Sequence, residues 1–135
     1  VNIDAQIINS YMQESGCTLA QLHFEAPNEL YKQLFVPHIK VIRAKNKEDI
    51  LKHPDEYRLI DAYCEAYGGV GKRLNIQWFD DIDCSKIILA GGLESSNVSI
   101  LKKYNFFGVD VSSGVEISHG KKDVTKVKAF ISNAK

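Results

Sequence analysis

The stretch "GVDVSSGVE", residues Gly108 to Glu116, carries the most information about the fold. It begins as an apolar, β-branched run typical of a buried strand, yet it ends in two serines and a glycine. An earlier stretch, "LAGGL" at residues 89–93, ends a second apolar run in a pair of glycines. Two strands that both end in small residues indicate that something other than packing is needed at those ends.

Outward from these stretches, strand and helix patterns alternate along the whole chain. Strands are predicted at residues 18–23, 38–44, 57–62, 85–90 and 106–111, and helices at residues 3–16, 27–35, 46–53, 76–79, 95–104 and 123–133. Ser95 or Ser96 is expected to cap the helix that follows the glycine pair. Alternation of this kind predicts an α/β fold, in which helices cover a parallel sheet.

Periodicity leaves two architectures open for the five βα units that follow Thr18. Five strands can complete an open, doubly wound sheet. Alternatively, eight units of about 24 residues would make roughly 190 residues, near the lower limit of a (β/α)8 TIM barrel. On that interpretation residues 1–135 form the last five βα units of one barrel domain, and roughly three units lie upstream of Val1.

Composition narrows the function classes. The chain has 17 basic and 17 acidic side chains, so it lacks the positive charge that attracts nucleic acid or an anionic membrane. Its three cysteines, Cys17, Cys64 and Cys84, have neither the pairing of a disulfide framework nor metal-site spacing, which favours a reducing cytoplasm and no metal. A small-molecule substrate is the expectation that remains.

The small residues at the two strand ends suit a bound phosphate. Without Cβ atoms, Gly91, Gly92 and Gly114 let the backbone approach an anion, and peptide N–H groups beside Ser113 can donate to it. In barrel enzymes the phosphate site is often formed by the loops after strands seven and eight. The alternative is that these residues serve only as turns and helix ends.

Three further side chains stand where predicted strands end. Asp61 follows "RLI", Asp110 lies within "GVDVSS", and His23 ends "AQLH". Active-site carboxylates of α/β enzymes gather at such positions, although each residue could instead be a cap or a hydrogen-bonded strand-end histidine. A row of lysines near the C-terminus, Lys121, Lys122, Lys126 and Lys128, is interpreted as a solvated helix face.

The ordered motifs resemble phosphoribosylanthranilate isomerase. They are "AQLH", "LIDA" followed by "GGVGK", "ILAGGL" with "NV", "GVDVSSGVE" and "GKKD", and they extend over nearly the whole chain. The resemblance implies the last five-eighths of a (β/α)8 barrel of tryptophan biosynthesis. Such an enzyme converts N-(5-phosphoribosyl)anthranilate to 1-(2-carboxyphenylamino)-1-deoxyribulose 5-phosphate by an Amadori rearrangement, without a cofactor.

The resemblance also implies residue roles. Asp61 matches the general acid, whose pKa burial would raise. His23 and Asp110 match residues that line the substrate pocket. Phosphate contacts are implied for two sets of residues, Gly91, Gly92, Ser113 and Gly114 at the strand ends and Gly69 and Gly71 in the loop after Asp61. A further segment upstream, or a fused indoleglycerol-phosphate synthase domain, is a candidate partner.

Departures from the family pattern keep alternatives open. The family's general base is a cysteine in a Cys-Gly motif at the end of the first strand, and Cys17, Cys64 and Cys84 lack that context. Phe24 and Val70 also replace a usual glycine and threonine. Without the base, the chain alone is expected to be inactive. The alternative is a non-catalytic phosphate-ligand or assembly fragment of such a barrel; a synthase function would need lysines at strand ends, where none is predicted.

Overall fold

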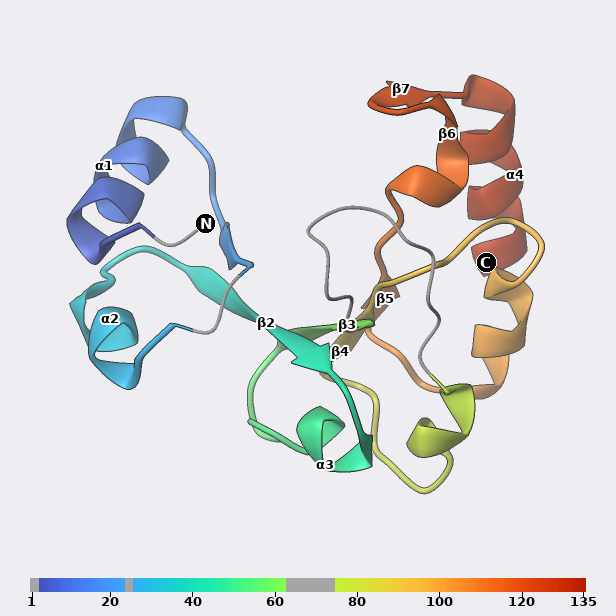
Figure 1. Ribbon diagram of the computed structural model, residues 1–135, viewed down its shortest axis with the longest axis horizontal. Coiled ribbons are helices and arrows are strands. Elements are labelled where there is room, and N and C mark those ends of the chain that lie inside the picture. Colours follow the sequence, from blue (N-terminus) through green and yellow to red (C-terminus); the bar gives the residue numbers. More distant parts are fainter. Residues whose placement is uncertain (1–2, 24–25, 63–74) are drawn as a thin grey trace.

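The computed structural model describes residues 3–23, 26–62 and 75–135 and contains a five-stranded parallel sheet (Figure 1). The strands follow one another across the sheet in sequence order, each paired in parallel with the next. They are β1 (Ala20–Leu22), β2 (His38–Ala44), β3 (Arg58–Ala62), β4 (Ile87–Leu89) and β5 (Gly108–Val109). The predicted α/β fold with a parallel sheet is therefore confirmed.

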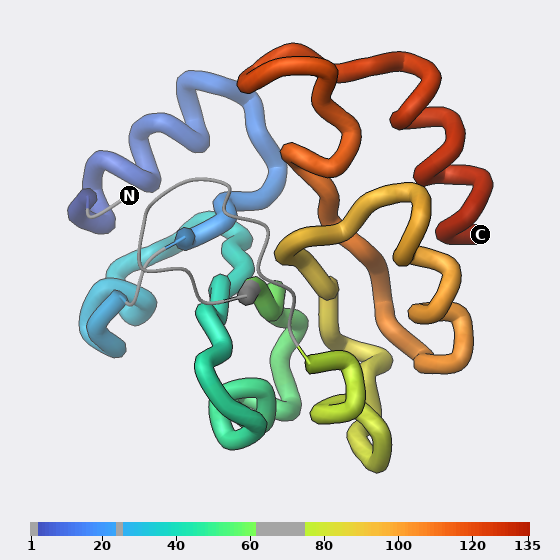
Figure 2. The backbone as a smooth tube through the Cα atoms, turned by 45° about the vertical axis from the view of Figure 1, so that its right-hand side comes forward, coloured from blue at the N-terminus to red at the C-terminus, as the bar shows by residue number. Residues whose placement is uncertain are grey.

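Helical segments connect the strands and lie outside the sheet in the order of the sequence (Figure 2). The α-helices are α1 (Ala5–Ser15), α2 (Asn28–Gln33), α3 (Lys47–Ile50) and α4 (Val124–Ala134), and the 3₁₀ helices are η1 (Ile76–Phe79), η2 (Val98–Lys103) and η3 (Ser113–Val115). A two-stranded antiparallel hairpin, β6 (Glu116–Ser118) and β7 (Lys121–Lys122), precedes α4. In the part of the chain that the structure describes, no helix is long and apolar enough to cross a membrane.

Alternating side chains give the sheet two different faces. Ile42, Ile60 and Leu89 belong to the main core, which Phe79, Val98 and Phe130 complete from the helical side. The opposite face carries a smaller apolar cluster of Ile39, Val41, Leu59 and Ala90. Arg43 and Asp61 follow Val41 and Leu59 at two-residue spacing, so they continue this second face toward the C-terminal ends of the strands.

One helix start differs from the sequence-based expectation, and another agrees with it. The helix after "LAGGL" begins at Val98 rather than beside a capping serine, because Asn97 occupies the preceding position. Ser96 Oγ instead donates to Glu94 Oε1 at 2.8 Å. Helix α4 agrees closely with the prediction, since the side chain of Asp123 caps it by accepting from the amides of Thr125 and Lys126.

The prediction of a solvated helix face holds for Lys126 and Lys128, which are exposed on α4, and is corrected for Lys121 and Lys122. Lys121 and Lys122 form strand β7 and precede α4. Lys122 Nζ donates to Ser112 O and to Glu116 Oε1, at 2.9 and 2.7 Å, and Lys126 Nζ donates to Glu116 O at 2.7 Å. Lys122 therefore joins the hairpin to the segment that follows β5, and Lys126 joins α4 to the hairpin.

Candidate active site

Parallel strands bring the predicted site residues to one edge of the sheet. His23 follows β1, Asp61 is the penultimate residue of β3, Gly91 and Gly92 follow β4, and Asp110 follows β5. The C-terminal ends of parallel strands are where α/β enzymes bind their ligands. The topology therefore supports the grouping that the sequence predicted.

His23 and Asp61 face one another across this edge. His23 Nε2 lies 3.5 Å from Asp61 Oδ2, and the two side chains are 36% and 23% exposed. The other ring nitrogen of His23, Nδ1, lies 3.3 Å from Arg43 Nη2. One imidazole thus stands between a guanidinium and a carboxylate, and the carboxylate keeps access to solvent.

Arg43 is the site residue that the sequence analysis missed. It lies in the alternating run "HIKVIRA", where Lys40 is also basic and neither residue stands at the end of the run. Its Cα is the register partner of Asp61 on the neighbouring strand. The signal available in the sequence was the alternation of "IKVIRA", which places Arg43 on the same face as Ile39 and Val41.

The loops after β4 and β5 form one compact unit. Gly91 and Gly92 have positive φ angles of 91° and 64°, which side chains other than glycine rarely adopt. Gly114 meets the first loop so closely that an added Cβ would overlap the carbonyl oxygen of Leu93 and lie 2.9 Å from its carbonyl carbon. The predicted proximity of the two loops is therefore a feature of the structure.

Side chains from outside the loops fix their shape. Asn97 Nδ2 donates to Gly92 O at 3.0 Å, and Asn97 Oδ1 accepts from the amide of Glu94 at 3.1 Å. The described residues offer no acceptor to the amides of Gly91, Gly92, Ser113 and Gly114. These loops therefore combine a fixed backbone with N–H groups to which no described residue is bonded, an arrangement that suits an anion.

The remaining predicted residues are placed less fully. Asp110 is exposed beyond β5, and its amide donates to Leu89 O at 2.8 Å. Gly69, Gly71 and Cys64 lie outside the described residues. Among residues 3–23, 26–62 and 75–135, no three His, Cys, Asp or Glu side chains gather as metal ligands would. Burial raises the pKa of the Cys84 thiol to about 11, so that this thiol stays protonated and a weak nucleophile at neutral pH.

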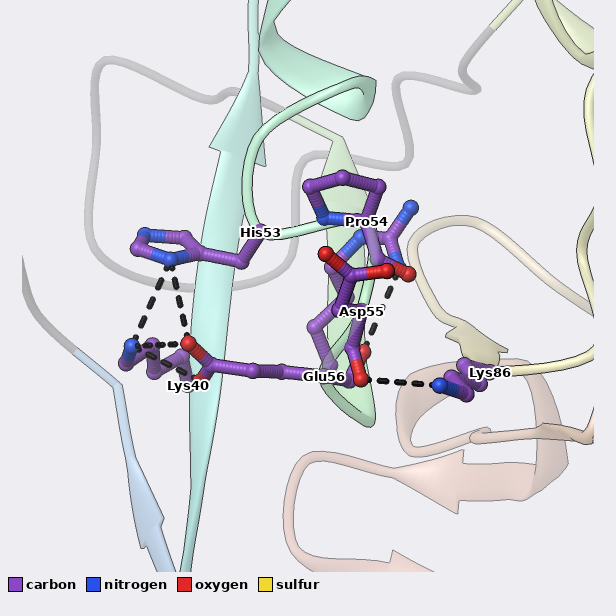
Figure 3. A network of polar contacts seen from close by, with 7 residues as sticks. Lys40, His53, Pro54, Asp55, Glu56 and Lys86 are labelled. Atoms are coloured by element: carbon purple, nitrogen blue, oxygen red, sulfur yellow. Dashed lines mark hydrogen bonds and ion pairs between the residues drawn. The ribbon is translucent and has the colours of Figure 1, made fainter.

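The opposite edge of the sheet carries a second polar group (Figure 3). Lys40 Nζ lies 3.3 Å from His53 Nδ1 and 2.8 Å from Glu56 Oε2, and the same His53 nitrogen lies 3.5 Å from Glu56 Oε1. The hydrogen bond from Lys40 holds the pKa of the Glu56 carboxyl below its usual 4.5.

Two more basic side chains donate to backbone oxygens beside the group of Lys40, His53 and Glu56. Lys86 Nζ donates to Asp55 O, and the fully buried Arg58 donates to the carbonyls of Ile50 and Glu56. These contacts fasten the loop between α3 and β3.

Comparison with known proteins identifies the family. The family model of N-(5'-phosphoribosyl)anthranilate isomerase matches residues 1–133. The isomerase of Sulfurovum sp. is 53% identical over the whole chain, which spans 69% of that protein, and the Nitratiruptor sp. isomerase is 53% identical over 118 residues, or 60% of its length.

Solved structures of isomerases of the same name resemble this chain. The Thermotoga maritima isomerase superposes with a TM-score of 0.83 at 33% identity, and covers 99% of this chain and 69% of its own. An isomerase in complex with reduced 1-(o-carboxyphenylamino)-1-deoxyribulose 5-phosphate gives a TM-score of 0.75 at 28% identity, with 98% and 67% covered. The chain belongs to the phosphoribosylanthranilate isomerase family.

Proposed function

We propose that this chain provides the general acid and the phosphate site of phosphoribosylanthranilate isomerase, the enzyme of tryptophan biosynthesis that defines its family. The observation that carries the proposal is the position of Asp61, opposite His23 at the C-terminal edge of the sheet that also bears the glycine loops. An acid and an anion site at one edge suit a substrate with a reactive ring at one end and a phosphate at the other.

Asp61 is the residue proposed to start the reaction. In its neutral form the carboxylic acid donates a proton to the furanose ring oxygen while the bond from that oxygen to the anomeric carbon breaks. The electron pair of the broken bond stays on the oxygen, and the amine nitrogen forms the C=N bond of an iminium. A base then removes the C2 proton to give the enolamine, and no described residue is assigned to that step.

The phosphate is proposed to bind at Gly91, Gly92, Ser113 and Gly114. Their amides are available to an anion, and the packing of Gly114 against Leu93 holds the two loops together. Lys122 adds a positive charge beside Ser112. A solved relative holds an analogue that carries a 5-phosphate, which supports an anion site in this family. His23 and Asp110 are proposed to line the remainder of the pocket.

Calorimetry with Gly92→Val tests the phosphate site, and Gly120→Val is its matched control. Both glycines have positive φ, 64° and 75°, so both substitutions strain the backbone, but only Gly92 lies beside the proposed anion. Loss of one charge-assisted hydrogen bond costs about 1.5–3 kcal/mol, or roughly 10–100-fold in affinity. We expect that loss for the phosphorylated product with Gly92→Val alone. Equal losses for a dephosphorylated product would place the phosphate elsewhere.

The location proposed for this reaction is the cytoplasm. Cys17 and Cys84 are both free thiols, which agrees with a reducing compartment. Fractionation of cells that express the enzyme, with isomerase activity as the marker, tests this location.

A further inference from the structure

We infer that Arg43 is a positioning residue that fixes the tautomer of His23 and so keeps the proton of Asp61 available to the substrate. The inference rests on the proposed role of Asp61 as the general acid. It starts from the contact between Arg43 Nη2 and His23 Nδ1, at 3.3 Å.

The protonation of this contact follows from the chemistry of the two groups. A guanidinium stays protonated in proteins and has only donors, so Nδ1 of His23 must accept the hydrogen bond. A neutral imidazole carries one proton, which therefore resides on Nε2. Protonation of both nitrogens would place an imidazolium N–H against the guanidinium, and like charges at this distance repel.

The tautomer determines what Asp61 encounters. With its proton on Nε2, His23 presents an N–H group to Asp61 Oδ2 at 3.5 Å, and this contact tolerates either the acid or the carboxylate. With the other tautomer, a bare Nε2 lone pair would face the carboxylic acid and act as a base toward it. Arg43 thus prevents His23 from taking the proton that the ring oxygen needs.

The sheet holds Arg43 where this role requires it. Arg43 and Asp61 are register partners in β2 and β3, and His23 directly follows β1. The ladder fixes the backbone positions of Arg43 and Asp61, and His23 lies next to the end of the adjacent strand. Since Arg43 acts through His23, its effect should depend on its donor groups and much less on its bulk.

Nitrogen-15 NMR of the His23 ring in the enzyme tests the tautomer directly. At a pH where the imidazole is neutral, we expect the shift of a protonated nitrogen at Nε2 and of an unprotonated one at Nδ1. Arg43→Met should move the spectrum toward the Nδ1-protonated form or a mixture, whereas Arg43→Lys, which keeps a donor, should retain the original pattern. Lys40→Met, at the opposite edge of the sheet, should leave it unchanged.

Kinetics test the consequence for catalysis. We expect Arg43→Met to lower kcat by at least about 10-fold with KM within about twofold, a smaller loss than the 10²–10⁴ typical of a general acid itself. Arg43→Lys should recover most of the rate. A wild-type spectrum with the proton on Nδ1 would overturn the inference, and so would an unchanged spectrum or an unchanged kcat in a folded Arg43→Met enzyme.

The two experiments separate this inference from the proposed function. If Asp61 were not the acid, Asp61→Asn would retain turnover, yet the nitrogen spectra would still report whether Arg43 sets the tautomer.

Discussion

The two edges of the sheet are built from the same three kinds of side chain. At the C-terminal edge Arg43, His23 and Asp61 combine a cation, an imidazole and a carboxylate. At the N-terminal edge Lys40, His53 and Glu56 do the same, with the cation again 3.3 Å from the imidazole and the imidazole 3.5 Å from the carboxylate (Figure 3).

The difference lies in which ring nitrogens are used. His53 contacts both partners through Nδ1, and Lys40 also bonds Glu56 directly, so the N-terminal group closes on itself. His23 contacts its two partners through opposite nitrogens, which polarises the ring from Arg43 toward Asp61. The closed group stabilises the loop between α3 and β3, whereas the polarised one is proposed to prepare the Asp61 carboxyl group for a ligand. Residue types alone therefore do not identify the functional edge.

The sharpest test of this comparison removes one carboxylate at a time. We expect Asp61→Asn to lower turnover at least about 100-fold, since a general acid typically contributes 10²–10⁴, while product binding is nearly retained. Glu56→Gln should leave turnover within about twofold. Steady-state kinetics of the two variants show which edge carries the catalytic carboxyl group. Near-normal turnover of Asp61→Asn would show that Asp61 is not the general acid.

A second test concerns the loops at the C-terminal edge. Gly114→Ala places a methyl group against the carbonyl of Leu93, and we expect a loss of about 3 kcal/mol in the free energy of unfolding, the upper range for overpacking. Gly108→Ala is the matched control, because its Cβ would lie 3.9 Å from Ile88 Cγ1, an ordinary contact. Urea unfolding measures both. Equal stability of the two variants would show that the loops are not packed as described.

Lys122 provides a smaller test at the same edge. Lys122→Met removes the bond to Ser112 O, which precedes the residues proposed to bind phosphate. We expect product affinity to fall about threefold to tenfold, because exposed charges are screened by salt. Lys121→Met makes the same change in net charge one residue away and should have little effect in the same titration. Similar losses in both variants would point to long-range attraction alone.

The smallest effect is expected at the N-terminal edge and depends on pH. Because Lys40 lowers the pKa of Glu56 in the folded state, the pair stabilises the fold above pH 4.5 and loses this contribution as the pH falls through the lowered value. Lys40→Met should therefore cost under about 1 kcal/mol at pH 7 and less at pH 3, since Glu56 is half exposed.

Lys86→Met is the control for that measurement. Lys86 donates to the carbonyl of Asp55, an acceptor that does not titrate, so its cost should change less between the two pH values. Denaturant unfolding of both variants at pH 7 and pH 3 gives the comparison. A Lys40→Met cost that grows at pH 3 would contradict the assignment.

The positions of the strands were largely predictable from sequence, whereas periodicity alone left their order across the sheet open. The run at residues 38–44 alternates clearly, and β2 occupies those residues. Helix faces were less predictable: Ile7, Ile8 and Tyr11 recur at helical spacing, but Ile7 and Tyr11 are 41% and 61% exposed while Ile8 is buried. In α1 the polar Asn9 is buried instead, because its side chain bonds Gln33 O and the amide of Phe35. Such long-range hydrogen bonds leave no periodic signal.

The site was predictable where chemistry coincides with strand ends. Asp61, His23 and the small residues at the strand ends could be predicted as site residues, since ligands commonly bind at the C-terminal edge of a parallel sheet. For Arg43 the alternation indicates the face of the sheet but not the contact with His23, which lies twenty positions earlier in the chain. The contact of Lys122 with Ser112 could not be predicted either, because it depends on a hairpin that the apolar pattern does not indicate.

The close packing of Gly114 against Leu93 also determines when the two loops can assemble during synthesis of the chain. A ribosome delivers the Gly91–Gly92 loop first, and Gly114, the hairpin and Asn133, which bonds Ser95 O, emerge over the next forty or so residues. At about 5–20 residues per second, this interval is roughly 2–8 s. During this interval the Gly91–Gly92 loop has been synthesised, but the loop that contains Gly114 and packs against it has not. The proposed phosphate site should therefore be among the last features to form on the nascent chain, well after Asp61 has been synthesised.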